Sequence, residues 1–182
     1  MDFKEFPKIA RLSREIIVTE KIDGTNAQIT IAEDGEMFVG SRTRWIDTLN
    51  DNHGFAKWVY TNKDELMKLG VGTHFGEWWG QGIQRGYGLS KGEKRFSLFN
   101  TSRWGDDEVR PACCGVVPVL YRGDFDTEKI KECIGKLRLF GSVAAPGFMK
   151  PEGIVIFHTA GNVMFKKTIE KDEVPKSLVN KA

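Results

Sequence analysis

The stretch Glu20-Lys21-Ile22-Asp23-Gly24-Thr25-Asn26 places a lysine at the end of one predicted β-strand and directly before another. Residues 15–19 are mostly β-branched and apolar, and residues 27–31 alternate between apolar and polar side chains, as strands do. Gly24 allows a tight turn between these strands or a close approach to a ligand. A lysine so placed is a candidate nucleophile if its surroundings favour the neutral amine. The alternative is a surface lysine beside an Asp-Gly turn.

The pattern Lys-x-Asp-Gly-x-Asn at residues 21–26 resembles the nucleotidyl-acceptor motif of the covalent nucleotidyltransferases. This superfamily comprises the DNA ligases, the RNA ligases and the mRNA capping enzymes, and its lysine accepts a nucleoside monophosphate as a phosphoramide. The resemblance implies that Lys21 is the catalytic nucleophile. It also implies that Glu20, Ile22 and Asn26 belong to the nucleotide-binding residues.

An Asp-Gly pair predicts a hairpin whose returning strand, residues 37–40, leads into Ser41-Arg42-Thr43-Arg44. If the strand continues, both arginines lie on one face, and arginine suits phosphate because its planar fork donates two hydrogen bonds at once. The alternative is a solvated strand end. The Ser-Arg pair also resembles the family element after the first hairpin. The resemblance implies that Arg42 contacts the nucleotide and Arg44 the polynucleotide.

Residues 52–70 have a helical pattern with an internal cap, which predicts two short helices. Residues 71–80 then predict a strand that carries Glu77 among aromatics and glycines. Such a carboxylate can accept hydrogen bonds from a ribose or hold a metal ion through water, whereas the alternative is a core strand with a surface glutamate. Phe-Gly-Glu-x-x-Gly resembles the third family motif, which implies that Glu77 contacts the nucleotide.

Residues 81–105 are rich in glycine, basic residues and aromatics. This composition suits a nucleic-acid backbone with exposed bases, and a solvated loop would have it equally. The candidate polynucleotide contacts here are Arg85, Lys94 and Arg95. The apolar strand 95–100 resembles the next family element, which implies that Phe99 stacks on the purine. Asn100 stands where the family usually has an aspartate.

The last predicted elements are a strand over residues 115–121 that contains a proline, a helix from the cap Asp126 to Gly135, and a hairpin over residues 151–168. They are expected to form the scaffold, apart from the charged residues of the hairpin.

Pairing outward from the turn of this hairpin sets Glu152 near the level of Lys166 and Lys167. In a metal–phosphate site, the carboxylate would bind the cation and the ammonium groups would bind phosphate oxygens. The alternative is an ordinary cross-strand ion pair. Glu-Gly-Ile-Val-Ile and Phe-Lys-Lys resemble the fourth and fifth family motifs. They imply that Glu152, like Glu77, binds metal and nucleotide, and that both lysines are catalytic. Lys166 is favoured because it follows Phe165, as the family lysine follows an apolar residue.

The composition is that of an ordinary globular protein. The 182 residues suffice for one domain with a core, and a net charge of +2 does not by itself indicate nucleic-acid binding. Three cysteines without regular spacing argue against a disulfide scaffold and for a reducing compartment. No apolar run has the length of a membrane span, and the N-terminus lacks a signal-peptide core. We therefore expect a cytoplasmic protein that has no membrane contact.

Together these elements follow the family order between residues 20 and 168. The resemblance implies an α+β, ATP-grasp-like nucleotidyltransferase fold, with antiparallel β-sheets flanked by helices around a nucleotide cleft. Residues 1–182 are expected to form a single adenylation domain without an OB-fold domain. Asn26 is typical of RNA ligases, since DNA ligases and capping enzymes usually have arginine there.

The expected function is therefore that of an ATP-dependent RNA ligase that uses ATP and Mg²⁺ or Mn²⁺. Its expected substrate is RNA with 5′-phosphate and 3′-hydroxyl ends, with a protein partner as a further source of RNA binding. Two alternatives stay open. One is a DNA ligase or capping-type nucleotidyltransferase. The other, of a different class, is a catalytically silent module that binds nucleotide or RNA.

Overall fold

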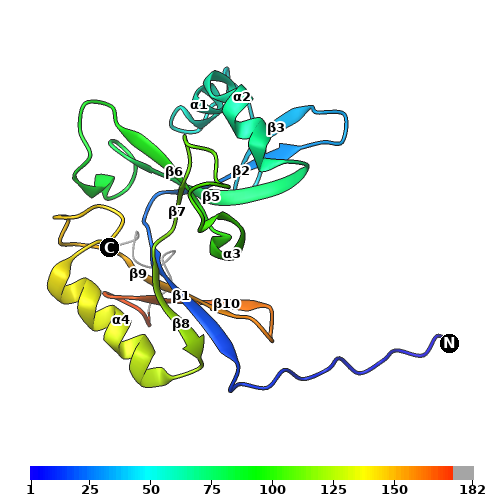
Figure 1. The fold of residues 1–182 in the computed structure, drawn as a ribbon, viewed down its shortest axis with the longest axis vertical. Coiled ribbons are helices and arrows are strands. Elements are labelled where there is room, and N and C mark those ends of the chain that lie inside the picture. The colour runs from blue at the N-terminus through cyan, green and yellow to red at the C-terminus, as the bar shows by residue number, and fades with distance from the viewer. Residues whose placement is uncertain (174–182) are drawn as a thin grey trace.

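The computed structural model describes residues 1–173 and arranges their strands in two sheets, which lie one above the other in Figure 1. The strands are β1 (Glu15–Lys21), β2 (Thr25–Ile31), β3 (Met37–Ser41), β4 (Trp45–Ile46), β5 (Gly72–Gly80), β6 (Lys94–Leu98), β7 (Gly115–Val116), β8 (Val119–Asp124), β9 (Gly153–His158) and β10 (Val163–Thr168). The helices are α1 (Phe55–Thr61), α2 (Lys63–Leu66), α3 (Thr101–Trp104) and α4 (Thr127–Phe140), with 3₁₀ turns η1 (Met67–Leu69) and η2 (Gly86–Gly88).

The four-stranded sheet has the order β10-β9-β1-β8, and every neighbouring pair in it is antiparallel. One face of this sheet packs against α4, because alternate residues of β1 and β9 are apolar and meet the apolar stripe of the helix. The buried cluster between them contains Ile16, Val18, Ile154, Ile156, Cys133, Ile134 and Leu137. The opposite face of the sheet is therefore left to carry other side chains, among them that of Lys21.

The six-stranded sheet has the order β4-β3-β2-β5-β6-β7. All its pairs are antiparallel except β6 and β7, which are parallel. Its core cluster contains apolar residues of β2 and β5 together with Phe55, Val59, Leu66 and Leu69 from α1, α2 and η1. Figure 1 shows α1 and α2 at the outer side of this sheet and α4 beside the other one. The predicted α+β fold of largely antiparallel sheets with flanking helices is thus confirmed.

The two sheets are joined where β1 runs into β2. The predicted strands around Lys21 are both present, but they do not pair with each other, since β1 pairs with β8 and β9 while β2 pairs with β3 and β5. The chain crosses from one sheet to the other over residues 22–24. Lys21 consequently stands at the junction of the sheets.

A second crossing shows that the prediction of one strand over residues 115–121 is wrong. The segment forms β7 in the six-stranded sheet and β8 in the four-stranded sheet, with Val117 and Pro118 between them. Pro118 has no N–H to donate to a ladder, so the strand cannot continue through it. Its carbonyl still accepts a hydrogen bond from the backbone N–H of Glu20 at 2.9 Å.

The capping prediction at Asp126 is confirmed, but the predicted end of the helix is wrong. The Asp126 carboxylate accepts hydrogen bonds from the N–H groups of Glu128 and Lys129, and α4 continues through Gly135 to Phe140. An interior glycine weakens a helix only modestly, and burial of Leu137 on the next turn favours continuation. The helix ends at Gly141, whose φ of 82° suits glycine.

One further detail of the predicted hairpins is wrong, and the condition set for another is not met. The turn between β9 and β10 pairs His158 with Val163, which sets Lys166 opposite Val155 and Lys167 opposite Ile154. Glu152 instead lies level with Ile169, whose N–H donates to the Glu152 carbonyl at 2.9 Å. Arg42 and Arg44 are expected on one face only if the strand continues. However, β3 ends at Ser41 and residues 42–44 form a tight turn into β4, so strand alternation does not place the two arginines.

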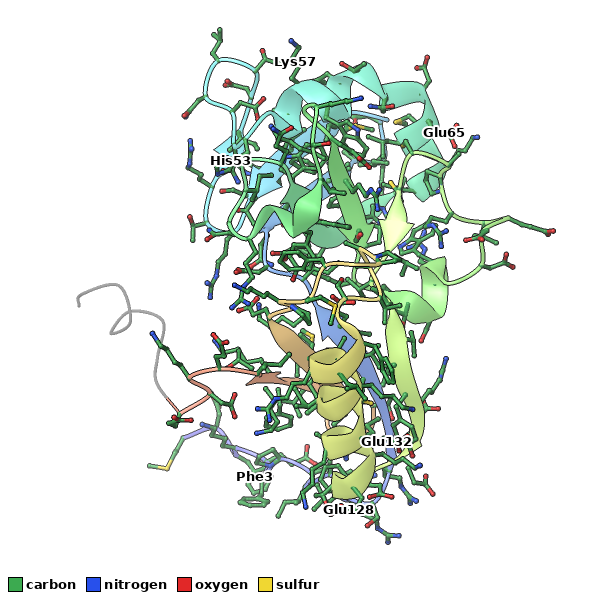
Figure 2. The ribbon with its side chains drawn as sticks, turned by 90° about the vertical axis from the view of Figure 1, so that its left-hand side faces the viewer. Phe3, His53, Lys57, Glu65, Glu128 and Glu132 are labelled. Carbon is green, nitrogen blue, oxygen red and sulfur yellow. The ribbon has the colours of Figure 1, made fainter. Side chains whose placement is uncertain are left out.

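The two short helices predicted over residues 52–70 are confirmed as α1 and α2, and η1 ends at Gly70. Within residues 1–173, no helix combines the length and the apolar character that crossing a membrane requires. Figure 2 shows the long dimension of the molecule, with His53 and Lys57 near the six-stranded sheet and Glu128 and Glu132 of α4 at the other end. The junction at Lys21 lies between these ends.

Candidate active site

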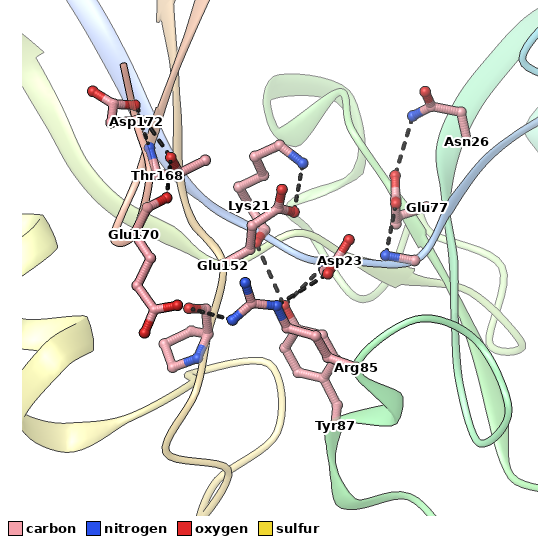
Figure 3. Close-up of polar contacts among 12 residues, drawn as sticks. Lys21, Asp23, Asn26, Glu77, Arg85, Tyr87, Glu152, Thr168, Glu170 and Asp172 are labelled. Carbon is pink, nitrogen blue, oxygen red and sulfur yellow. Dashed lines mark hydrogen bonds and ion pairs between the residues drawn. The ribbon is translucent and has the colours of Figure 1, made fainter. Parts of the chain in front are cut away.

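Lys21 is the last residue of β1 and points away from the α4 face of its sheet. Its Nζ lies 2.6 Å from Oε2 of Glu152, which directly precedes β9 (Figure 3). The Lys21 side chain is 21% exposed and that of Glu152 is 3% exposed. The amine is therefore reachable from solvent on one side, while the carboxylate fixes it from the buried side. The structure thus brings together the predicted nucleophile and a predicted metal-binding residue.

Glu20 serves a different purpose from its neighbour. Strand alternation turns its side chain to the α4 side, where the carboxylate accepts hydrogen bonds from Ser142 Oγ at 2.6 Å and from the N–H groups of Val143 and Ala144 at 2.8 and 2.9 Å. Three donors satisfy this buried charge. The structure does not bring the Glu20 carboxylate to Lys21. Its carboxylate anchors the loop after α4 to the end of β1.

The side chain of Ile22 is likewise buried in the protein core rather than exposed at the site. It is 3% exposed and packs in a small cluster with Trp79, Tyr87, Val117 and Ala145. This burial fixes the backbone directly after the lysine. Lys21 is thereby held between two residues whose side chains are both buried in the body of the protein.

Gly24 and Asn26 tie the same segment to β5. The Glu77 carboxylate accepts hydrogen bonds from the Gly24 N–H at 2.9 Å and from Asn26 Nδ2 at 3.1 Å. Gly24 runs so close to β5 that a Cβ atom there would meet the Trp78 carbonyl oxygen and lie 2.7 Å from Trp79 Cβ. The close approach allowed by this glycine is therefore to another strand of the protein. It places the predicted residues Asn26 and Glu77 side by side.

Glu77 also has an unusual proton affinity. Burial raises its pKa to about 7, against the lowering effects of the Gly24 N–H and of Lys21. The neighbouring carboxylates Glu152 and Asp23 contribute to this rise. Of these two carboxylates, Glu152 pairs with Lys21 at 2.6 Å and Asp23 pairs with Arg85 at 3.0 Å.

The carboxylates near Lys21 suit a divalent cation that keeps some of its water ligands. They do not suit a metal ion that is coordinated by protein side chains alone. Residues 1–173 contain no group of three or more His, Cys, Asp or Glu side chains arranged to hold a metal ion. Mg²⁺ commonly keeps several waters and takes only one or two carboxylates together with substrate phosphates. Glu152, with the nearby Glu77, provides carboxylates of that kind.

The two lysines of β10 lie on opposite faces of the sheet. Lys166 is opposite Val155, which is opposite Thr19, so Lys166 shares the face of Thr19 and Lys21. Lys167 is opposite Ile154 on the α4 face, and its Nζ pairs with Asp172 at 3.1 Å. Although the predicted level of Glu152 is wrong, the alternation favours Lys166 over Lys167 as the lysine that serves the site.

A cavity of about 490 Å³ lies beside this constellation. It brings together three of the predicted nucleotide-binding residues, Asn26, Arg42 and Phe99, although they come from separate segments. Phe75 and Met164 contribute apolar surface from both sheets. Phe99 is 39% exposed, so its ring is available to a ligand. The remaining lining residues are Ala27, Gln28, Ser41, Thr73, His74, Asn100, Arg103 and Trp104.

The four predicted polynucleotide contacts fare differently. Arg44 is exposed, whereas Lys94 Nζ donates to the His53 carbonyl at 2.8 Å. Arg95 pairs with Glu93 in an exposed ion pair and lies over the Trp79 ring. Arg85 donates to Asp23 and to the carbonyls of Lys150 and Pro151. Arg85 therefore belongs to the surroundings of Lys21 rather than to an open basic surface.

Sequence reasoning missed two residues of this site. Asp23 stood inside the motif without an assigned role, and Tyr87 was only one aromatic among several. The Tyr87 hydroxyl accepts a hydrogen bond from the Asp23 N–H at 2.8 Å. The motif itself was a signal for Asp23. No sequence signal pointed to Tyr87, because 64 residues separate it from its partner.

Comparisons with known proteins now bear on this arrangement. A family model described as RNA ligase matches residues 14–169. No curated protein sequence matches the chain. Among solved structures, the Naegleria gruberi RNA ligase resembles it in several forms. A variant with ATP and Mn has a TM-score of 0.61 and 20% identity, over 86% of this chain and 50% of that one.

Two further forms of the same ligase agree with this likeness. A variant with AMP and Mn has a TM-score of 0.62 and 20% identity, over 94% of this chain and 52% of that one. The form with pyrophosphate has a TM-score of 0.61 and 20% identity, over 86% and 50%. At this identity the likeness shows a shared fold. The chain spans about half the length of these structural relatives.

Proposed function

The chain belongs to the RNA ligase family, and on that premise we propose that it is an ATP-dependent RNA ligase with Lys21 as its nucleophile. The observation that carries this proposal is the Lys21–Glu152 pair at the junction of the sheets, beside a cavity lined by Asn26, Arg42 and Phe99. The buried carboxylate gives the partly exposed amine a fixed position, from which it can attack a bound electrophile once it has lost its proton. The cavity between the sheets is the proposed nucleotide cleft.

In the first step Lys21 Nζ forms a bond to the α-phosphorus of ATP, and the bond from that phosphorus to the bridging oxygen breaks. Pyrophosphate leaves, and a lysyl–AMP phosphoramide remains on the protein. The amine must lose a proton to attack; because Lys21 is partly exposed, that proton can pass to solvent, while Glu152 Oε2, at 2.6 Å, holds the amine in place. Phosphoryl-type transfer depends mainly on alignment and charge neutralisation, so the fixed position of Lys21 matters as much as its reactivity.

Several side chains would hold the nucleotide in this scheme. Phe99 offers a ring on which a purine can stack, and Arg42 offers a fork for phosphate oxygens. Asn26 is held by Glu77 at the cavity wall, where the pair can meet ribose hydroxyls. Lys166, on the face of Lys21, supplies positive charge for the phosphates. Mg²⁺ or Mn²⁺, held by Glu152, Glu77 and water, would add neutralisation of the phosphate charge.

Two further transfers complete the proposed reaction. The adenylyl group passes from Lys21 to the 5′-phosphate of an RNA end, which breaks the phosphoramide bond and frees the amine. The 3′-hydroxyl of a second end then attacks that activated phosphate, and AMP leaves. Ribose hydroxyls allow a protein to recognise RNA, and the amide of Asn26 in the cavity wall is suited to such contacts.

The test is the mass of the intact protein after incubation with ATP and magnesium. We expect a gain of one AMP in the wild type and in Lys57→Ala, which changes an exposed lysine on α1 far from the junction (Figure 2). Lys21→Ala should lose the adduct, and so should Lys21→Arg, because a guanidinium does not deprotonate to attack. An adduct of GMP from GTP would instead indicate a capping-type enzyme. No adduct with either nucleotide would indicate a binding module without turnover.

Sealing is tested separately with nicked duplexes and single strands that differ only in the sugar at the 3′ side. We expect joined product when that sugar is ribose and weaker joining when it is deoxyribose. Equal or better joining of all-DNA ends would contradict the RNA assignment. Adenylylated ends that accumulate without joining would indicate that another protein or segment supplies RNA binding.

A further inference from the structure

The hydroxyl of Tyr87 touches the backbone on both sides of Ile22, within the segment that carries Lys21. It accepts a hydrogen bond from the Asp23 N–H at 2.8 Å and donates to the Lys21 carbonyl at 3.5 Å (Figure 3). Burial raises the pKa of the Tyr87 hydroxyl, so it keeps its proton and can act as donor and acceptor at once. One side chain thus spans the turn that sets the direction of Lys21.

The ring of Tyr87 is held rigidly. It is 2% exposed, stands edge-on to Trp79 with the centroids 5.3 Å apart, and lies 4.6 Å from the centroid of Phe148. Because Trp79 belongs to β5 and Phe148 to the loop after α4, the ring is fixed from two separate parts of the fold. A hydroxyl on such a ring has a defined position, which a flexible side chain would not provide.

The backbone of Tyr87 adopts a conformation that a bulky residue avoids. Its φ is 52°, between Gly86 at 67° and Gly88 at 71°. A non-glycine residue of this size in the left-handed region is strained, and such strain persists where the surroundings impose it, often at functional sites. Glycine readily adopts the positive φ found at residues 86 and 88. Tyrosine does not, so backbone preference alone does not explain why a tyrosine stands between them.

Arg85 connects the same turn to Glu152. Its Nε donates to Asp23 Oδ2 at 3.0 Å and its Nη1 donates to the Lys150 carbonyl at 2.9 Å, two residues before Glu152. Residues 85–87 therefore contact both the segment after Lys21 and the segment before its acid partner. Their contacts thus link the two segments that carry the amine and the carboxylate.

We propose that Tyr87, supported by Arg85, is a positioning residue that fixes the Lys21 backbone for attack on the nucleotide. This inference rests on the proposed function, because it assigns a role in forming the lysyl–AMP adduct. The hydroxyl provides the positioning, while the ring provides the packing. Removal of the hydroxyl alone should therefore lower the rate of adduct formation and leave nucleotide affinity unchanged.

The experiment compares Tyr87→Phe with the wild type and with Tyr121→Phe. Tyr121 is the matched control, since its hydroxyl donates to the Asp124 carbonyl at 2.9 Å on β8, away from the junction. In single-turnover adenylylation, Tyr87→Phe should react on the order of 10- to 100-fold more slowly at saturating ATP. The half-saturating ATP concentration should stay within about twofold, as expected when ground-state binding is kept. Tyr121→Phe should match the wild type in both values.

A second measurement does not depend on catalysis. Hydrogen exchange at the Asp23 amide should be faster in Tyr87→Phe than in the wild type, because that N–H loses its acceptor. Unchanged exchange together with an unchanged rate would overturn the inference. A wild type that forms no adduct would overturn the proposed function instead, and the Asp23 amide would still report on the Tyr87 contact.

If Tyr87→Phe does not fold, Arg85→Lys takes its place. Lysine keeps the charge but loses the planar fork that reaches both Asp23 and the Lys150 carbonyl. Its rate at saturating ATP should fall with the half-saturating concentration unchanged. A wild-type rate in Arg85→Lys, measured by the same assay, would contradict the proposal.

Discussion

Residues that adjoin in the motif have separate tasks because each side chain meets a different part of the fold. Glu20 holds the loop after α4, Lys21 pairs with Glu152, and Ile22 is buried beside Tyr87. Asp23 pairs with Arg85, and Gly24 leaves room for β5. The lysine is thus the member of this stretch whose charged end meets Glu152, on the face of the sheet opposite α4.

Glu77 gives a testable pH dependence at the scale of one residue. Because its pKa is raised from 4.5 to about 7 in the folded protein, the native state keeps a proton that the unfolded chain has lost in that interval. The contribution of Glu77 to the free energy of unfolding should therefore be fully present below pH 4.5 and be lost as pH rises through about 7, a change of up to about 3 kcal/mol. Urea titrations across this range, with a chelator and without nucleotide, measure it.

The matched variant is Glu77→Gln, whose amide does not titrate. It should abolish this contribution, so the difference in unfolding free energy between the two proteins should vary with pH. A difference that stays constant from pH 4 to pH 8 would show that Glu77 ionises normally, contrary to its burial.

Gly24 gives a prediction about packing. In Gly24→Ala the new Cβ would lie 2.7 Å from Trp79 Cβ and would also meet the Trp78 carbonyl, so β5 must shift. We expect a loss of about 1–3 kcal/mol in unfolding free energy, together with slower adenylylation. Gly135→Ala is the control, because a Cβ at that exposed helical position meets nothing within 4 Å. It should stabilise by about 0.5–1 kcal/mol, and equal effects of both variants would contradict the packing argument.

At the scale of the element, the pleat of β10 separates two lysines that the sequence presents as equivalent. Lys166 lies on the face of Lys21, whereas Lys167 lies on the α4 face and pairs with Asp172. Because successive side chains of a strand point to opposite faces, a single-residue change of register would exchange their roles.

Alanine variants of these lysines test this register. Lys166→Ala should slow adduct formation by more than about tenfold, since removal of one charge-stabilising group commonly costs a few kcal/mol of barrier. Lys167→Ala should cost less, because only an exposed ion pair is lost. Rates of AMP incorporation at saturating ATP decide between them. If Lys167 proved the essential residue, the strand would pair differently in the working enzyme.

At the scale of the whole molecule, the site exists because the chain crosses between its sheets. The crossing after β1 carries Lys21, and the crossing after β7 sets Pro118 against Glu20. Glu152 comes from a third segment, which follows the loop after α4. Residues that are 131 positions apart thereby meet at 2.6 Å.

The N-terminal arm gives a prediction at this scale. Residues 1–11 have exposed side chains and extend away from the sheets in Figure 1, and Phe3 lies on this arm in Figure 2. Deletion of residues 2–11 should change the unfolding free energy by less than about 0.5 kcal/mol, measured by thermal or urea denaturation. Deletion that extends through Glu15 should destabilise clearly, because the Glu15 carbonyl accepts two hydrogen bonds from Thr159. A large loss from the shorter deletion would show that the arm packs in solution.

The sequence by itself determined the strands around Lys21, the helices over residues 52–70, the cap at Asp126 and the family. These follow from local preferences: strand alternation, turn residues, capping side chains and a motif of fixed spacing. Resemblance to the family motifs predicted Lys21, Glu77 and Glu152 as residues of one nucleotide site. Pro118 was visible in the sequence, but one strand was predicted through it, so neither the break at Pro118 nor the sheet to which each half belongs was predicted.

Only the tertiary structure decided which side chains face the cleft and which are bound elsewhere. It assigned Glu20 to the loop after α4, Arg85 to Asp23, and Tyr87 to the turn beside Lys21. These contacts join segments 62 to 122 residues apart. The physical reason is that local preference fixes the direction of a side chain relative to its own strand or helix. The partner that it meets depends on how the two sheets pack, which no short stretch of sequence specifies.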